Sequence, residues 1–363
     1  MGRNRNRSFA TKLVLDSVNL TPEVVKGAAH CRHLEILELR NYKPQNCKYL
    51  NAFIYLPRLK CLTVNVDDRN LHSSRPPVDG AIQPQAQKFR PLSQFHFKGG
   101  FSMLQTIAND LIRAPHLRSI QVELTKYPTS VTHTKSYQPS HNNLCFSISD
   151  LLRPFSIAPS AAVESVAISF NSNDKQANES LPRHAVSILS SFSNLRHLEI
   201  SGIGMFALND ALSELTSLWP KIQTLHLPLA DNCFQTAPKV GHSLTLSNLQ
   251  RIAQSCPELV SFRAPIAIPE DLTLFTAKVL HHPLTSLSVG SRQPIRQPVD
   301  AVNKAKYFAR CLCAMFPDLR NIYVHQNYNP DFWSEVKRLV ELCNDVRGFD
   351  RIRALASSLK DGR

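Results

Sequence analysis

The chain has 363 residues, of which 43% are hydrophobic and 19% charged, and its formal net charge is +14. This balance predicts a folded protein with a substantial core and excludes the hydrophilic composition of a disordered chain. No stretch approaches the roughly 18 apolar residues that span a bilayer, and no apolar leader follows Met1. Nine cysteines are scattered without paired spacing, so we expect reduced thiols and a cytoplasmic or nuclear location.

A triplet of apolar residues recurs along the chain, with two variable positions before its second member and one before its third. The last two members alternate as in a short strand with one buried face, and the first member, the anchor, begins the turn into that strand. Stacked copies would place these strands side by side in a parallel sheet. The copies are Ala10, Leu13, Leu15; Leu34, Leu37, Leu39; Leu59, Leu62, Val64; Leu92, Phe95, Phe97; Leu117, Ile120, Val122; Val163, Val166, Ile168; Leu195, Leu198, Ile200; Ile222, Leu225, Leu227; Leu259, Phe262, Ala264; Leu284, Leu287, Val289; and Leu319, Ile322, Val324.

Helices are predicted between the strands. Thr21 can cap a helix that has Pro22 at its first position, and Leu246, Leu249 and Ile252 form the apolar face of another. A proline stands two residues before several anchors, where it ends the helix, and the residue before it is mostly apolar and expected to be buried. These prolines are Pro57, Pro115, Pro220, Pro257 and Pro317. The spacing of the closest anchors matches the roughly 20 to 29 residues of a leucine-rich repeat.

The predicted fold class is therefore α/β, a leucine-rich-repeat solenoid of horseshoe shape with its parallel sheet on the concave face and its helices on the convex face. We expect a basic tail over 1–8, about eleven irregular repeats over 9–328, and a capping helix with a basic tail over 329–363. Polar segments near 67–90, 126–143, 171–182 and 290–298 are expected to be loop inserts. In the cap, Phe332 or Trp333, Val336, Leu339, Val340 and Cys343 form one apolar stripe.

The segment from Ile252 to Leu259, with Cys256 before Pro257, resembles the cysteine-containing leucine-rich repeat, and the segment from Ala28 to Leu34 is a shorter echo of it. The loose repeats, long inserts and closing helix resemble fungal F-box-like repeat proteins. That resemblance implies a substrate-recognition module of a ubiquitin ligase that holds its substrate on the repeats. The F-box that would dock the ligase adaptor is not seen, so an adaptor partner is expected only if an F-box lies upstream.

No pattern of catalytic, cofactor-binding or metal-binding residues stands out, so we expect a protein that is not an enzyme and needs no cofactor or metal. Gly99–Gly100 and Gly202–Ile203–Gly204 lack the further residues of a phosphate-binding loop. Cys311 and Cys313 lie two apart in a predicted helix and are interpreted as core residues. His281 and His282 have no zinc motif around them and are interpreted as surface residues.

The outward positions of the strands are expected to bind a protein partner. Their charges cancel, with Lys12, Arg40, Lys98 and Arg263 against Asp16, Glu38, Glu123 and Glu199. The predicted binding residues are His96, His197, His226, Arg263, Tyr323 and His325, with Tyr323 and Arg263 preferred because tyrosine and arginine often anchor interfaces.

The alternative is a nucleic-acid-associated protein that uses its basic ends and inserts. These carry Arg3, Arg5, Arg7, Arg69, Arg75, Lys88, Arg90, Arg292, Arg296, Arg347, Arg351 and Arg353. The clusters are separate and contain few aromatic residues for stacking on bases, so this partner is expected to be the less favoured one. No membrane partner is expected.

Overall fold

The structure is a computed structural model, and its chain forms two compact units. Unit 1 comprises Met1–Asp174 and His184–Asn194, and unit 2 comprises Lys175–Arg183 and Leu195–Arg363. The structure describes residues 10–17, 20–42, 53, 56–66, 91–100, 103–104, 107, 115–126, 162–170, 188–202, 212, 216–227, 244–268, 277–291, 298–327 and 329–361. The predicted basic tail over 1–8 and almost all of the four predicted inserts lie outside these residues.

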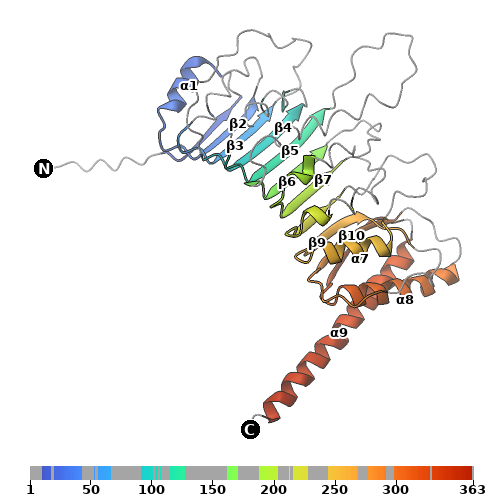
Figure 1. Cartoon of the computed structure of the whole chain (residues 1–363). Coiled ribbons are helices and arrows are strands. Elements are labelled where there is room, and N and C mark those ends of the chain that lie inside the picture. The colour runs from blue at the N-terminus through green and yellow to red at the C-terminus, as the bar shows by residue number, and fades with distance from the viewer. Residues whose placement is uncertain are drawn as a thin grey trace, which may run out of the picture. The chain divides into compact units, whose positions relative to one another are not determined.

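The part of unit 1 that the structure describes has six parallel strands, which pair in chain order (Figure 1). Their registers keep equivalent triplet residues side by side, so that Leu37 lies beside Leu13 on one side and Leu62 on the other. Helix α1 (Pro22–Ala29) begins as predicted, with the Thr21 side chain accepting a hydrogen bond from the Val24 backbone. The strands are β1 (Lys12–Asp16), β2 (Ile36–Tyr42), β3 (Cys61–Val66), β4 (Gln94–Gly100), β5 (Ser119–Lys126) and β6 (Ser165–Phe170).

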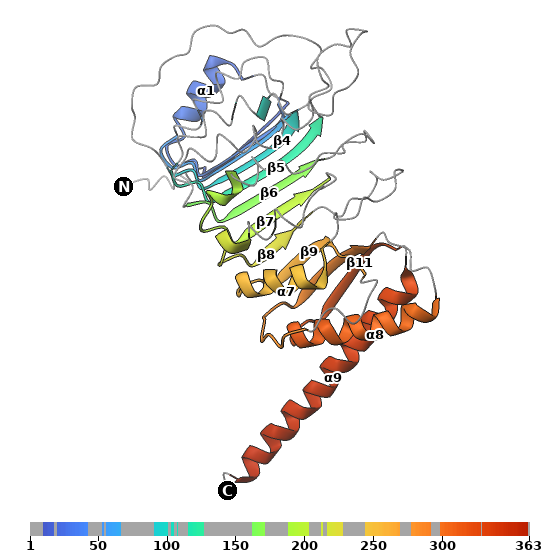
Figure 2. The same ribbon diagram turned by 45° about the vertical axis from the view of Figure 1, so that its right-hand side comes forward.

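In its described residues, unit 2 has five parallel strands in chain order and three helices, with α7 and α8 layered on one side of β9 to β11 (Figures 1 and 2). Phe262 lies between Leu225 and Leu287 in the register. The strands are β7 (His197–Ser201), β8 (Thr224–His226), β9 (Ser261–Pro265), β10 (Ser286–Ser291) and β11 (Asn321–Asn327), and the helices are α7 (Leu246–Ser255), α8 (Pro298–Met315) and α9 (Pro330–Asp361).

The core of each unit consists of ladders of equivalent triplet residues. Leu37, Leu62 and Phe95 are fully buried in unit 1, as are Leu225 and Phe262 in unit 2. A fully buried side chain of this size stabilises the fold by about 1.5–3 kcal/mol. Because each strand contributes two or three such side chains to the same face, the alternating pattern is what holds consecutive repeats together.

The predicted prolines lie in tight turns that connect the helical segments to the strands. The backbone amide of Leu259 donates a hydrogen bond to the carbonyl of Cys256 over 3.1 Å, and the same bond joins Leu319 to Phe316 over 3.2 Å. This closes a four-residue β-turn with the proline in its second position, where the fixed φ of proline suits the turn. We call the residue before each of these prolines the corner residue, and the described ones, Leu56, Trp219, Cys256 and Phe316, are buried as predicted. Phe192, which stands three residues before the anchor Leu195, is buried at the equivalent position.

Gly99 lies at an irregularity in the pairing of β4 with β5. A Cβ at this position would lie 2.8 Å from the Cβ of Val66 and 3.0 Å from the ring of Phe97. The glycine therefore allows neighbouring strands to pack closely, which gives this residue a structural role.

The interpretation of His282 as a surface residue is wrong, because the structure buries it. Its neighbour His281 is exposed, as the sequence suggested. The Leu284 amide donates to Nδ1 of His282 over 3.2 Å, so the ring proton sits on Nε2 and is donated to the Cys256 carbonyl over 2.8 Å. The ring also packs edge-on against Phe316, with centroids 5.4 Å apart. His282 thus occupies the corner of this repeat in its neutral form.

Acidification should destabilise the fold through His282. Burial lowers its pKa from the ordinary value of 6.5, opposed by its bond to the Cys256 carbonyl. The unfolded chain therefore takes up a proton before the folded chain does, so the contribution to stability is complete above pH 6.5 and is lost as pH falls from there through the folded pKa. We expect the urea midpoint of His282→Gln to change less than that of the wild type between about pH 7.5 and 5.5. His281→Gln is the exposed control, and equal pH dependence in all three proteins would contradict the prediction.

Helix α9 begins as the predicted cap and continues to Asp361. Both Phe332 and Trp333 are buried, together with Val336 and Val340. The two aromatic rings pack edge-on against Phe308 of α8, with centroids 5.8 and 5.4 Å away. Among the described residues, no helix has the length and apolar character needed to cross a membrane.

Candidate functional site

The candidate site is the exposed face of the sheet, formed by the residues that alternate with the buried ladders. On β3 and β6, every second residue is buried and those between remain partly exposed. Neighbouring strands lie side by side (Figure 2), and their parallel register places the intermediate residues in rows across them.

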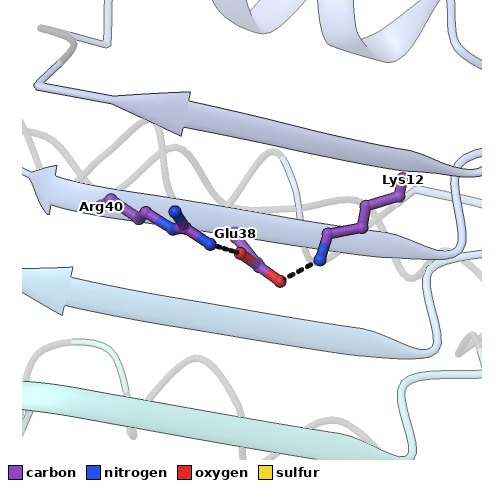
Figure 3. Close-up of polar contacts among 3 residues, drawn as sticks. All are labelled: Lys12, Glu38 and Arg40. Carbon is purple, nitrogen blue, oxygen red and sulfur yellow. Dashed lines mark hydrogen bonds and ion pairs between the residues drawn. The ribbon is translucent and has the colours of Figure 1, made fainter.

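In unit 1, Glu38 is held by two cations on this face (Figure 3). Its carboxylate lies 2.5 Å from Lys12 Nζ on β1 and 2.8 Å from Arg40 Nη2 on β2. Hydrogen bonds from Lys12 and then Arg40 lower the pKa of Glu38. Asp16 pairs instead with Asn41 and Ser17, and these bonds lower its pKa.

The other charges predicted for this face are also paired. Lys98 Nζ lies 2.6 Å from Glu123 on the adjacent strand, and Arg263 Nη2 donates to Glu199 over 3.0 Å. The prediction of a charge-balanced face is thus confirmed, and the structure adds that each of its four cations contacts an acid. Among the described residues of this face, the paired charges leave no excess of either sign to attract a highly charged ligand.

In unit 2, one row of residues crosses five strands. Glu199 pairs with His226, His226 with Arg263, Arg263 with Ser288, and Ser288 with Tyr323. We call these five residues the central row. At about 4.8 Å between strands, Tyr323 and Arg263 stand roughly 10 Å apart on the same face.

The part of the central row from Glu199 to Arg263 is held in place by contacts within the protein. Arg263 reaches across β8 to Glu199, and its side chain is only 21% exposed. His226 shares a 2.8 Å hydrogen bond with Ser261. Burial lowers the pKa of His226, as does the nearby Arg263, against the opposing effect of Glu199. His226 is therefore a neutral side chain held in place at physiological pH.

Arg263 has one unsatisfied donor, because its Nε is buried without a hydrogen-bond partner. A buried donor without a partner costs about 1–3 kcal/mol. Since its Nη2 contacts Glu199 and only 21% of the side chain is exposed, Arg263 positions Glu199 more than it projects toward solvent.

Tyr323 forms the exposed end of the central row, and 54% of its surface is accessible. Around it lie small polar residues, with Ser288 beside it and the Ser286–Asn321 pair in the neighbouring row. A tyrosine on a strand loses little conformational freedom when it is covered, and it offers both a ring and a hydroxyl. The predicted exposure of this residue is confirmed.

The structure brings most of the predicted binding residues together in unit 2. His226, Arg263 and Tyr323 lie in the central row, and His197 shares a 3.2 Å hydrogen bond with Thr224 in the neighbouring row. His325 is exposed on β11, two residues beyond Tyr323. His96 belongs to unit 1, where it is half-buried and burial lowers its pKa.

Ser288 was not named among the site residues predicted from the sequence. Because it lies between Leu287 and Val289, the two inward residues of a triplet, the repeat pattern predicts that it faces outward. The same criterion identifies every member of the central row.

The described part of the chain contains no group of three His, Cys, Asp or Glu side chains placed to hold a metal ion. Cys311 and Cys313 are buried in α8, which confirms their interpretation as core residues. Burial raises the pKa of Cys256 and of Cys313 to about 12, so these thiols stay protonated at physiological pH.

Repeated strand and turn units, stacked into parallel sheets with helices on the buried side, define an α/β leucine-rich-repeat solenoid, which is the fold class of this chain. No protein-family model matches the chain, and no characterised protein matches it in sequence. Among solved structures it is similar to the leucine-rich repeat-containing protein LegL7 from Legionella pneumophila, with 14% sequence identity over 91% of this chain and 90% of that chain and a TM-score of 0.36.

Proposed function

We propose that this chain is a non-catalytic scaffold that captures a protein partner on the exposed face of its sheet. The observation that carries the proposal is Tyr323, an exposed aromatic side chain on a strand among small hydroxyl and amide groups. Aromatic residues of this kind often supply most of the binding energy at protein interfaces. The surrounding serines can donate and accept hydrogen bonds, and binding a partner there does not require a charged group to be desolvated.

The paired charges favour a protein over a nucleic acid as the partner. Nucleic-acid binding depends on cations that are free to neutralise phosphates, whereas Lys98 and Arg263 already contact Glu123 and Glu199. Arg347, which belongs to the predicted basic cluster near the end of the chain, donates instead to the carbonyls of Pro317 and Cys313. In the part of the chain that the structure describes, no feature favours the nucleic-acid alternative.

At a finer level, we infer a role as the substrate-recognition module of a ubiquitin ligase, in which the captured protein is the substrate. Support comes from the resemblance of the Cys256 turn to cysteine-containing repeats of F-box proteins. Cys256 is buried at the corner of its turn, where its thiol donates to the Thr216 carbonyl over 3.5 Å. Contact with the ligase adaptor would need a docking element of its own, so it is tested separately.

The scaffold proposal is tested by comparing the partners retained by immobilised wild-type, Tyr323→Ala and Val279→Ala proteins. Val279 is the control because it is also a large, exposed hydrophobic side chain, but it lies outside the strands. We expect Tyr323→Ala to weaken capture of a specific partner at least about tenfold and Val279→Ala to leave it unchanged. Identical partner sets and affinities for all three proteins would refute the assignment of the face.

Two further measurements distinguish a substrate-recognition module of a ubiquitin ligase from a nucleic-acid-associated protein. Co-purification of the ligase adaptor with the full chain, and ubiquitination of the partner that depends on Tyr323, are expected for a substrate-recognition module. Binding to DNA or RNA fragments that falls steeply between low and high salt would instead support the nucleic-acid alternative.

A further inference from the structure

Strand β1 lies at an edge of the sheet in unit 1. It pairs with β2 on one side, and among the described residues no strand pairs with it on the other side. Its pairing with β2 covers all five residues without a bulge, and the strand contains no proline. Bulges and prolines are two of the features that prevent an edge strand from pairing with another chain, and β1 has neither.

The backbone groups of β1 alternate between its two sides. The Thr11 carbonyl accepts a hydrogen bond from the Ile36 amide, so the odd-numbered residues of this segment bond to β2. Successive residues of a strand direct their amide and carbonyl groups to opposite sides. The amides and carbonyls of Lys12, Val14 and Asp16 therefore point away from β2, in the direction in which β2 itself bonds to β1.

The two buried ladders of unit 1 are incompletely covered at β1. Leu37 and Leu39 of β2 are almost fully buried between strands on both sides, whereas the equivalent Leu13 and Leu15 are partly exposed. On the opposite face of the strand, 39% of Val14 is accessible. A further strand with apolar residues at its inward positions would cover these side chains, as each later strand covers the one before it.

We propose that β1 is a self-association site, at which it pairs antiparallel with β1 of a second copy of this chain about a two-fold axis at Val14. Leu13 of each copy then lies beside Leu15 of the other, so both apolar ladders continue across the axis. The axis falls at the middle of the strand, because β1 covers residues 12 to 16 and the chain leaves the extended conformation at Ser17, which has a φ of 53°.

The backbone groups fit this register. Opposite residues in an antiparallel pair alternate between those that exchange two hydrogen bonds and those that exchange none. With Val14 on the axis, the exchanging pairs are Val14 with its own equivalent and Lys12 with Asp16, and these residues direct their amides and carbonyls away from β2. A register displaced by one residue would place inward side chains opposite outward ones.

Charge complementarity favours a second copy as the occupant and distinguishes between the remaining registers. With the axis at Val14, Lys12 of each copy lies opposite Asp16 of the other, which brings opposite charges together twice. An axis at Leu13 would place Lys12 opposite Val14, and an axis at Leu15 would do the same to Asp16. Only the central register pairs both charges.

Both charged side chains have the capacity for this contact. Figure 3 shows Lys12 against Glu38, yet 49% of the Lys12 side chain is exposed and an ammonium group has three N–H donors. The Asp16 carboxylate accepts hydrogen bonds from Asn41 and Ser17 at Oδ1, and its two oxygens together can accept more than two. Neither residue has to give up a partner within its own copy.

Antiparallel pairing closes at two copies, since each copy contributes the same edge. The contact involves one strand from each copy, which falls at the small end of the range for specific complexes. We therefore expect a dimer in equilibrium with its monomer, with a dissociation constant on the order of micromolar. The site belongs to unit 1, so it does not depend on the proposed capture of a partner at Tyr323 in unit 2.

Sedimentation equilibrium of the full chain across the micromolar range tests the proposal. We expect a mass that approaches twice the monomer mass, and an association constant at least about tenfold lower for Val14→Pro, which removes the amide at the axis. An edge strand tolerates this proline because the lost amide points away from β2. Val14→Thr is the matched control, since it keeps both the amide and the β-branched shape, and it should dimerise like the wild type.

A mixture of two charge variants tests the register. Alone, Asp16→Lys sets lysine against lysine and Lys12→Glu sets glutamate against aspartate, so each should associate at least about tenfold more weakly than the wild type. Mixed, the two should form a dimer, because a lysine of the first variant then faces an acid of the second at both ends of the strand pair. This test needs no proline, so it decides the outcome even where Val14→Pro does not fold.

Several results would overturn the proposal. A wild type that stays monomeric, a Val14→Pro dimer as strong as that of the wild type, or a mixture no stronger than its components would each do so. So would a monomeric chain that retains a protein partner which Val14→Pro loses, because the edge would then accept a strand of that partner.

Discussion

Phe262→Ala will lower the free energy of unfolding by about 3–5 kcal/mol, the range typical of a buried phenylalanine truncated to alanine. Phe262 is fully buried on β9, and its ring lies in the ladder between Leu225 and Leu287. Truncation removes the contacts to both neighbouring repeats at once, and the stacked strands on either side hold the space open. The measurement is the urea midpoint of unfolding, followed by circular dichroism at fixed protein concentration.

Val260→Ala is the control for this effect. Val260 lies just before the same strand, is 41% exposed, and uses its backbone amide rather than its side chain to bond Gln223. We expect a loss below about 1 kcal/mol. Equal shifts in the two variants would mean that the ladder is not the source of stability.

Trp333→Ala should cost about 3–5 kcal/mol, with its effect concentrated at the carboxyl end of unit 2. The indole is almost fully buried and packs edge-on against Phe308 and Phe332, with centroids 5.4 and 5.1 Å away. Edge-to-face pairs add about 0.5–1.5 kcal/mol each to the effect of burial. Because each layer of a repeat protein is stabilised by its neighbours, loss of the cap should loosen the adjacent layers first.

Hydrogen exchange resolves that local effect. In Trp333→Ala, amides of α8 and β11 should lose more protection than those of β7, which lies farthest along the strand order of unit 2. Val302→Ala, on the exposed side of α8, is the matched control and should change little. Uniform loss of protection across unit 2 would contradict a capping role for α9.

Most of the strands could be predicted because their signal is local. A triplet such as Leu259, Phe262 and Ala264 specifies which residues face inward by alternation alone, and a proline at Pro257 marks the turn before it. The same alternation identified Tyr323 as an exposed residue, and opposite charges at outward positions predicted a balanced face.

What the sequence determined by itself was the repeat: inward and outward positions, turns, the start of the capping helix and the charge balance of the exposed face. The tertiary structure decided which partner each side chain has. It places Arg263 against Glu199 across an intervening strand, buries His282 although the sequence suggested a surface residue, and directs Arg347 to the backbone carbonyls at the end of α8. These outcomes depend on residues from other repeats, and the distance between them in space is set by packing rather than by periodicity.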